Sequence, residues 1–267
     1  MDILQSIILG LTQGITEFIP VSSSGHLELV QSLLGGRDAD FHTFLSFINL
    51  GTLLALIIYF RHRIIKICQD VFQHKNYKLA LNIIITCIPA GLAGLLLSHV
   101  IHTNDFFSAL GTIAVMMGLV GIAMIFVDKL PHLSKLKDEN HLTKPRALAI
   151  GLAQILALIP GTSRSGTTII AGRMMGLNNK SAAEYSFLVS IPLMSAVILK
   201  TFLDGDDRAY LFANFGSLML SNLVAFIAGL AAISFIMKYL TKPKSLQTFG
   251  YYRVILASIV LVFVLIM

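Results

Sequence analysis

Apolar stretches of roughly 20 residues recur along this chain, and they constrain its fold more than any other feature. A helix needs about that length to cross the hydrocarbon core of a bilayer. The pattern predicts six spans, at residues 42–60, 78–101, 107–127, 181–203, 215–238 and 247–267. Of the 267 residues, 55% are hydrophobic and 13% are charged, and a soluble domain usually carries about twice that charge. We therefore expect an all-α polytopic membrane protein, with residues 1–267 forming a single integral membrane domain.

Two further apolar regions, 2–34 and 145–176, are interrupted in the middle. The interruptions read "FIPVSSSGH" and "LIPGTSRSGTT", each with a proline followed by serines. The segment after each interruption is too short for a helix that crosses the membrane. We interpret both regions as re-entrant helical hairpins, which gives about six spans and four half-helices.

The two hairpins resemble each other in sequence. "GLTQGITEFIPVSSSG" (10–25) and "GLAQILALIPGTSRSG" (151–166) share an initial GLxQ and a final serine-glycine pattern at the same spacing. The chain is therefore predicted to be a duplication, with halves at approximately 1–130 and 145–267. Each half contains one hairpin, which returns to its own side, and three spans, which do not. The second half must then start on the opposite face, and this makes an inverted repeat.

Basic residues are concentrated in alternate loops. The segments 61–78, 128–146 and 238–244 are rich in Lys and Arg, whereas 31–41, 102–106 and 204–208 are poor in them. Cytoplasmic loops carry the excess of positive charge, so this alternation predicts the orientation of a multi-pass membrane protein. Its N-terminus and first hairpin would lie outside, and the second hairpin would enter from the cytoplasm. The net charge of +6 is explained by these loops, so no nucleic acid partner is predicted.

Two hairpins entering from opposite faces would bring their breaks together near the middle of the membrane. Ser22, and either Ser163 or Thr162, are good N-cap residues for the helices that follow. Free amide groups at a helix N-terminus form an anion site, and phosphate is a frequent occupant. The predicted phosphate-binding residues are Ser22, Ser24, Gly25, Thr162, Ser163, Ser165 and Gly166.

Three ionisable residues flank the breaks and are expected to face one polar junction: Glu17, His26 and Arg164. Together with the serines, they suggest a phosphoryl-transfer site, because ionisable groups inside a membrane are costly and usually functional. Structural roles stay open for each residue alone: the serines as caps, His26 as a buried histidine, and Arg164 as an ion-pair partner of Glu17. Glu184 follows Ser181 by three residues, a spacing that predicts a capping box.

At these residues the sequence resembles the bacterial undecaprenyl-diphosphate phosphatase family, known for bacitracin resistance. "GITEFIPVSSSGHL" and "PGTSRSGTTI" are similar to its two signature motifs, and "AAEYSFLVSIP" to the segment after the second. The resemblance implies hydrolysis of undecaprenyl diphosphate to the monophosphate with a divalent cation, Mg²⁺ or Ca²⁺. The family's (Glu/Gln)-x-x-x-Glu pattern falls on Gln13 and Glu17 as metal-binding residues, and Gln13 cannot supply a carboxylate.

The expected mechanism divides the work among four residues. Arg164 binds the diphosphate together with the two helix N-termini, and Glu17 holds the metal with Gln13. His26 is either the general base or the nucleophile, and Ser23 is the rival nucleophile. The expected partners are the membrane and a polyprenyl diphosphate lipid, and a homodimer is left open. A different class of function, a polyprenyl-phosphate transporter or flippase, fits the same inverted-repeat scaffold.

Overall fold

Helices account for all the regular structure in the described part of the chain. The computed structural model describes residues 2–34, 41–129, 136–242 and 244–266. The first half contains α1 (Ile3–Phe18), α2 (Ser23–Leu33), α3 (Phe41–Phe47), α4 (Asn49–Tyr59), α5 (Arg61–Phe72), α6 (Lys78–Thr103), α7 (Asp105–Ser108) and α8 (Leu110–Val127). The second half contains η1 (Glu139–His141), α9 (Lys144–Gln154), η2 (Ile155–Leu158), α10 (Arg164–Met174), α11 (Asn179–Leu203), α12 (Gly205–Ala213), α13 (Phe215–Tyr239) and α14 (Ser245–Ile266).

Six segments of the described chain are long and apolar enough to cross a membrane. They are Phe41–Tyr59, Lys78–Leu97, Leu110–Val127, Asn179–Leu203, Phe215–Tyr239 and Ser245–Ile266. The predicted all-α polytopic fold and its six spans are therefore confirmed. The first span differs in detail, since it consists of α3 and α4 with a break at Ile48. Parts of the predicted loops, at 35–40 and 130–135, lie outside the described residues.

Both predicted hairpins are present. The first is α1 and α2, and the second is α9 and α10 with the 3-10 turn η2 between them. The helices after the two breaks have 11 residues each, or roughly 16 Å of rise, well short of a span. The hairpins therefore turn inside the bundle, as the sequence predicts.

The halves interlock through glycines on the first helix of each hairpin. α1 packs against α13, and α9 packs against α6. A Cβ on Gly10 would lie 2.6 Å from the carbonyl oxygen of Ser221, and one on Gly151 would lie 2.6 Å from that of Thr86. These two glycines are equivalent in the repeat, and small residues allow such close approach of helices in a membrane. Each hairpin is thus held by a span of the other half.

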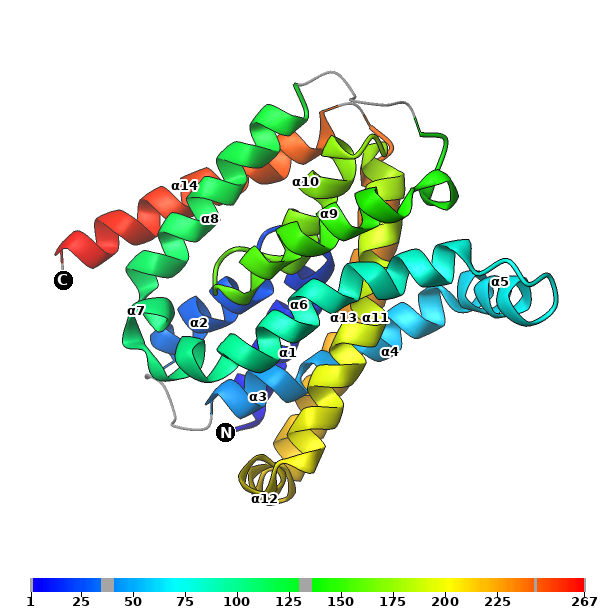
Figure 1. Cartoon of the computed structure of the whole chain (residues 1–267). Coiled ribbons are helices and arrows are strands. Elements are labelled where there is room, and N and C mark those ends of the chain that lie inside the picture. Colours follow the sequence, from blue (N-terminus) through cyan, green and yellow to red (C-terminus); the bar gives the residue numbers. More distant parts are fainter. Residues whose placement is uncertain (1, 35–40, 130–135, 243, 267) are drawn as a thin grey trace.

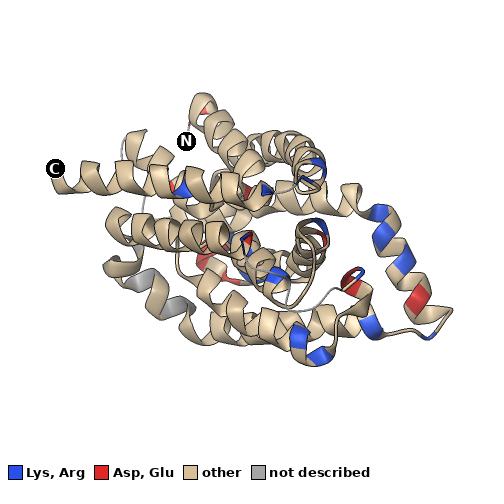
Figure 2. Ribbon diagram, turned by 90° about the horizontal axis from the view of Figure 1, so that it is seen from above, with Lys and Arg blue, Asp and Glu red and all other residues tan. Residues whose placement is uncertain are grey.

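The helix ends gather at two opposite ends of the bundle (Figure 1). α5 lies at the right and the first residues of α9 and α14 lie towards the upper right, whereas the C-terminus and α7 lie at the left and the N-terminus and α12 lie towards the bottom. Lys and Arg are concentrated at the end that carries α5 (Figure 2). The charge asymmetry in the sequence is therefore also an asymmetry in space.

The start of α11 corrects one prediction. The helix begins at Asn179, and the Asn178 side chain accepts a hydrogen bond from the Ser181 amide at 2.8 Å. The capping box predicted from Ser181 and Glu184 is wrong, because the N-cap is Asn178, three residues before Ser181. Glu184 instead lies 3.5 Å from Nε of Arg63.

Candidate active site

The two hairpin breaks have the same local structure. Ser22 has φ 78° and ψ 91°, and Ser163 has φ 74° and ψ 113°, a conformation uncommon for residues other than glycine. The Ser22 hydroxyl accepts a hydrogen bond from the amide of Gly25, and the Ser163 hydroxyl accepts one from that of Gly166. Both predicted N-caps are confirmed, with Ser163 rather than Thr162 in the second hairpin. Free first-turn amides therefore start at each break.

A cavity of about 200 Å³ lies between the breaks. It is much larger than the space that one buried water needs. The residues that line it come from α1, α2, α4, η2 and α10: Glu17, Ser23, Ser24, Asn49, Ala157, Ser163, Arg164 and Ser165. Polar groups from both halves of the chain thus face one space between the two hairpins.

Glu17 is the centre of the polar contacts in this cavity. Its Oε1 accepts a hydrogen bond from Nη2 of Arg164 at 2.5 Å. Its Oε2 accepts one from the Ser23 hydroxyl at 2.5 Å and one from Nε2 of Gln13 at 3.0 Å. The carboxylate is 8% exposed, so it needs these partners. The ion pair joins the two hairpins, and Glu17, Ser23 and Arg164 are brought together as predicted.

The oxygen atoms around Glu17 limit the kind of metal site that could form. Among the described residues, no group of three His, Cys, Asp or Glu side chains gathers. Glu17 supplies the one carboxylate that lines the cavity in the described chain, and Oδ1 of Asn49 lies 3.1 Å from Nε2 of Gln13. This set fits Mg²⁺ held partly by substrate phosphates. It does not fit a cation held entirely by protein ligands.

His26, expected at the same junction as Glu17 and Arg164, instead points away from it. Its Nδ1 lies 2.8 Å from the Ser22 carbonyl oxygen, and its Nε2 lies 2.8 Å from the Tyr252 hydroxyl on α14. The two rings are stacked, with centroids 5.8 Å apart. Because a carbonyl only accepts, the neutral ring carries its proton on Nδ1 and Tyr252 donates to Nε2. Within the described residues His26 does not line the cavity, so its chemical role stays a prediction.

Arg253 on α14 binds both breaks, although the sequence analysis did not select it. Its side chain is fully buried. The guanidinium donates to the carbonyl oxygens of Pro20 at 3.3 Å, Gly161 at 2.8 Å, Thr162 at 3.1 Å and Met117 at 3.0 Å. An arginine inside an apolar span was a signal in the sequence, because burying such a charge needs a specific reason. Its contacts give that reason, because Arg253 holds the two breaks next to each other.

The remaining predicted phosphate-binding residues separate into two groups. Ser24, Ser163 and Ser165 line the cavity, whereas Ser22, Gly25, Thr162 and Gly166 lie behind it and are buried. Methionines of α8 cover both glycines, since a Cβ on Gly25 would lie 3.0 Å from Met117 and one on Gly166 would lie 3.2 Å from Met124. The second group therefore shapes the breaks rather than facing a ligand.

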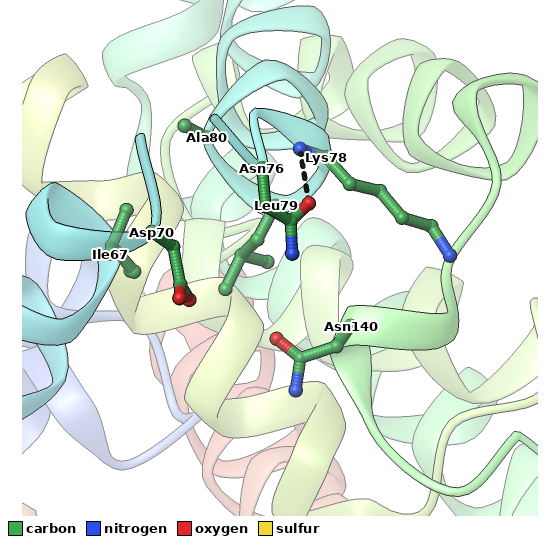
Figure 3. A pocket seen from close by; sticks show the side chains of 7 residues that line it. All are labelled: Ile67, Asp70, Asn76, Lys78, Leu79, Ala80 and Asn140. Carbon is green, nitrogen blue, oxygen red and sulfur yellow. Dashed lines mark hydrogen bonds between the residues drawn. The ribbon is translucent and has the colours of Figure 1, made fainter. Parts of the chain in front are cut away.

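A smaller cavity of about 30 Å³ lies at the base of α5 (Figure 3). The residues that line it are Ile67, Asp70, Asn76, Lys78, Leu79, Ala80 and Asn140. It has room for a water molecule and not for a phosphate. The cavity between the breaks is therefore the candidate active site.

The sequence matches the model of a family described as bacitracin resistance protein BacA over residues 6–259. The chain belongs to this family. An undecaprenyl-diphosphatase from Methylobacillus flagellatus is 36% identical over 98% of this chain and 99% of its own length. Undecaprenyl-diphosphatase 1 from Clostridioides difficile is 38% identical over 98% of this chain and 96% of its own. An undecaprenyl-diphosphatase from Wolinella succinogenes is 38% identical, with 98% of each chain covered. The match to the BacA family includes both hairpin breaks, and the resemblance seen in the sequence is confirmed.

Proposed function

We propose that this protein hydrolyses undecaprenyl diphosphate to undecaprenyl phosphate and inorganic phosphate. The observation that carries the proposal is the convergence of Glu17, Ser23 and Arg164 at an intramembrane cavity between two helix N-termini. A long polyprenyl tail stays in the lipid while its diphosphate enters such a cavity. The reaction recycles the lipid carrier of cell-wall synthesis and, by removing the diphosphate form, confers resistance to bacitracin.

Arg164 and the two breaks bind the diphosphate. Among the described residues that line the cavity, Arg164 is the only cation. A guanidinium donates two parallel hydrogen bonds to phosphate oxygens, and the N-terminal amides of α2 and α10 add donors and the positive ends of two helix dipoles. These groups also stabilise the charge on the phosphoryl group during its transfer.

Ser23 is the nucleophile that the contacts support over His26. Its hydroxyl lines the cavity and donates to Glu17 at 2.5 Å, whereas both ring nitrogens of His26 are engaged outside it. In the proposed step Oγ of Ser23 attacks the terminal phosphorus and gives its proton to Glu17. The bond between this phosphorus and the bridging oxygen breaks, and the lipid monophosphate leaves. Water then hydrolyses the phosphoserine and releases inorganic phosphate.

A divalent cation, Mg²⁺ or Ca²⁺, is part of the proposal. Glu17 and the amide oxygens of Gln13 and Asn49 would hold it, with phosphate oxygens as further ligands. When bound, it would neutralise charge on the diphosphate. In the structure the Arg164 guanidinium already neutralises Glu17. Arg164 therefore has to exchange its contact with Glu17 for one with the diphosphate. Only then is the Glu17 carboxylate free to bind the cation.

Phosphate release by the purified protein in detergent tests the function directly. Micelles have no second leaflet, so a flippase without hydrolytic activity would release nothing from undecaprenyl diphosphate. We expect release that requires an added divalent cation and stops with chelator. Purified wild-type protein that is folded but releases no phosphate would overturn the proposal and restore the transporter hypothesis.

The location and orientation are proposals as well. The bacterial cell membrane fits the lipid substrate, and the concentration of basic residues near α5 supports placing that end in the cytoplasm. A cysteine at Asp206 in α12 should react with an impermeant thiol reagent from outside, and one at Asp138 only after permeabilisation. Equal labelling of both sites would contradict the inverted repeat. The homodimer stays a prediction, to be tested by the mass of the detergent-solubilised protein.

A further inference from the structure

α5 is attached to the bundle along one edge. None of the 12 described residues of this helix is buried. Ile64 and Ile67 pack against the hydrophobic core, and the Arg63 guanidinium binds Glu139 of η1 and lies near Glu184 of α11. These contacts fix the helix in place and leave its other faces uncovered.

A second face of α5 is apolar and uncovered. Ile65 is 53% exposed and Phe72 is 82% exposed, and Cys68 between them is also exposed. Residues spaced three and four apart lie on one side of a helix, so these three form a stripe next to the attached edge. Water is an unfavourable neighbour for such a stripe.

Basic residues surround the stripe. Arg61, Lys66, Lys75 and Lys78 are all exposed, and the region forms the concentration of positive charge at one end of the molecule in Figure 2. The repeat counterpart, α12, has Asp206 and Asp207 in its first turn and lies towards the opposite end of the bundle (Figure 1). The positive charge therefore belongs to α5 and not to both connecting helices.

The position of α5 places it at the level of a membrane surface. It begins directly after α4, which completes one span, and the next span starts at Lys78. The helix runs across the direction of α4, since Figure 1 views it nearly along its axis and Figure 2 from the side. Tyr77, 54% exposed, is an aromatic residue of the kind enriched at membrane interfaces.

We propose that α5 is a membrane-surface helix that binds anionic phospholipid. Ile65, Cys68 and Phe72 insert at the boundary between headgroups and acyl chains, and the surrounding lysines and Arg61 contact anionic headgroups. This is the arrangement of an interfacial amphipathic helix. Ile58, near the end of α4, is also 43% exposed, so exposed apolar residues lie on both sides of the junction between the span and α5.

The native Cys68 provides the test. The full-length protein carrying Cys87→Ala is labelled at Cys68 with an environment-sensitive fluorophore and placed in nanodiscs of phosphatidylcholine alone or with phosphatidylglycerol. We expect quenching by spin-labelled lipid, little quenching by aqueous iodide, and a larger blue shift with phosphatidylglycerol. High salt should reduce the difference between the two lipid compositions, because exposed charges are screened.

Two matched variants sharpen the result. His62→Cys, in a background of Cys68→Ser and Cys87→Ala, labels an exposed residue on the polar side of α5 and should show strong iodide quenching. Lys66→Gln with Lys75→Gln should remove the effect of phosphatidylglycerol while lipid quenching at Cys68 remains. Iodide quenching at Cys68 equal to that at His62→Cys would overturn the proposal, and so would protection from both quenchers, which would mean that protein covers the stripe. Phosphate release checks that each variant is folded.

Discussion

The two hairpin breaks have nearly the same backbone and different chemistry. Both begin with a capping serine at positive φ and are followed by an 11-residue helix. At equivalent positions, however, the first break has Ser23 and the second Arg164, and Leu158 stands where the first hairpin has Glu17. The two breaks thus share a backbone with free helix N-terminal amides and differ in the side chains that they supply to the cavity. Neither hairpin alone supplies all the polar groups that line it.

The largest effect should come from the second break. Arg164→Ala removes the cation of the cavity, and we expect phosphate release to fall by roughly 10³-fold or more, as for other arginines that contact a transferred phosphoryl group. Arg164→Lys keeps the charge but loses the planar fork, so its loss should be large but smaller. The measurement is the initial rate with undecaprenyl diphosphate in detergent.

Arg164→Ala also leaves Glu17 buried without its counter-ion, so misfolding could imitate a catalytic loss. The double variant Arg164→Ala with Glu17→Gln removes that unpaired charge. We expect it to recover thermal stability but not activity. A double variant that hydrolysed the lipid at near wild-type rate would mean that the ion pair is structural. The side chains that differ between the two breaks would then have no separate roles in the reaction.

The next effect separates two residues of the first break. Ser23→Ala should abolish turnover, because it removes the proposed nucleophile. His26→Ala should retain a measurable rate, because His26 does not line the cavity and Glu17, the proposed acceptor of the Ser23 proton, stays in place. The assay is phosphate release across a pH series, with folding checked for both variants.

The opposite ranking, with His26→Ala inactive and Ser23→Ala only weakened, would make the imidazole the nucleophile. It would also require His26 to leave Tyr252 during turnover. Near wild-type activity in both variants would remove the polar residues of the first break from the chemistry. The second break alone would then have to carry the reaction.

Local patterns in the sequence predicted the backbone of both breaks, and long-range contacts decided the rest. Proline followed by serine and glycine identifies a helix end and an N-cap from a few neighbouring residues, and Ser22 and Ser163 were confirmed in that way. The orientation of His26 depends on Tyr252, at the other end of the chain. Glu184 fitted a local capping pattern, but Arg63 from helix α5, distant in the sequence, lies beside it. Such partners depend on how the two halves of the chain pack together. A short stretch of sequence does not contain that information.

A smaller effect is expected from removing the Tyr252 hydroxyl, which is the hydrogen-bond partner of His26. Thr167, the residue equivalent to His26 in the second hairpin, has no such partner in the described chain. Tyr252→Phe keeps the ring but removes the hydroxyl that donates to Nε2. One hydrogen bond contributes about 1 kcal/mol, so we expect roughly a fivefold lower rate if His26 acts in turnover. In a His26→Ala background the same substitution should have no further effect, and an undiminished effect there would assign Tyr252 a role separate from His26.

The smallest effects should be equal at the two breaks, because they concern the backbone that the copies share. Ser22→Ala and Ser163→Ala each remove one capping hydrogen bond, which typically contributes about 1 kcal/mol. Glycine at either position also loses that bond, but it adopts the positive φ of 78° or 74° without strain and is a better cap than alanine. We therefore expect Ser22→Gly and Ser163→Gly to be more stable than the matching alanine variants by similar amounts. Unfolding in mixed micelles, followed by helical circular dichroism, measures all four. A large loss of stability for one alanine variant and none for the other would contradict this expectation. It would show that the two breaks depend unequally on their caps, although their dihedral angles are nearly the same.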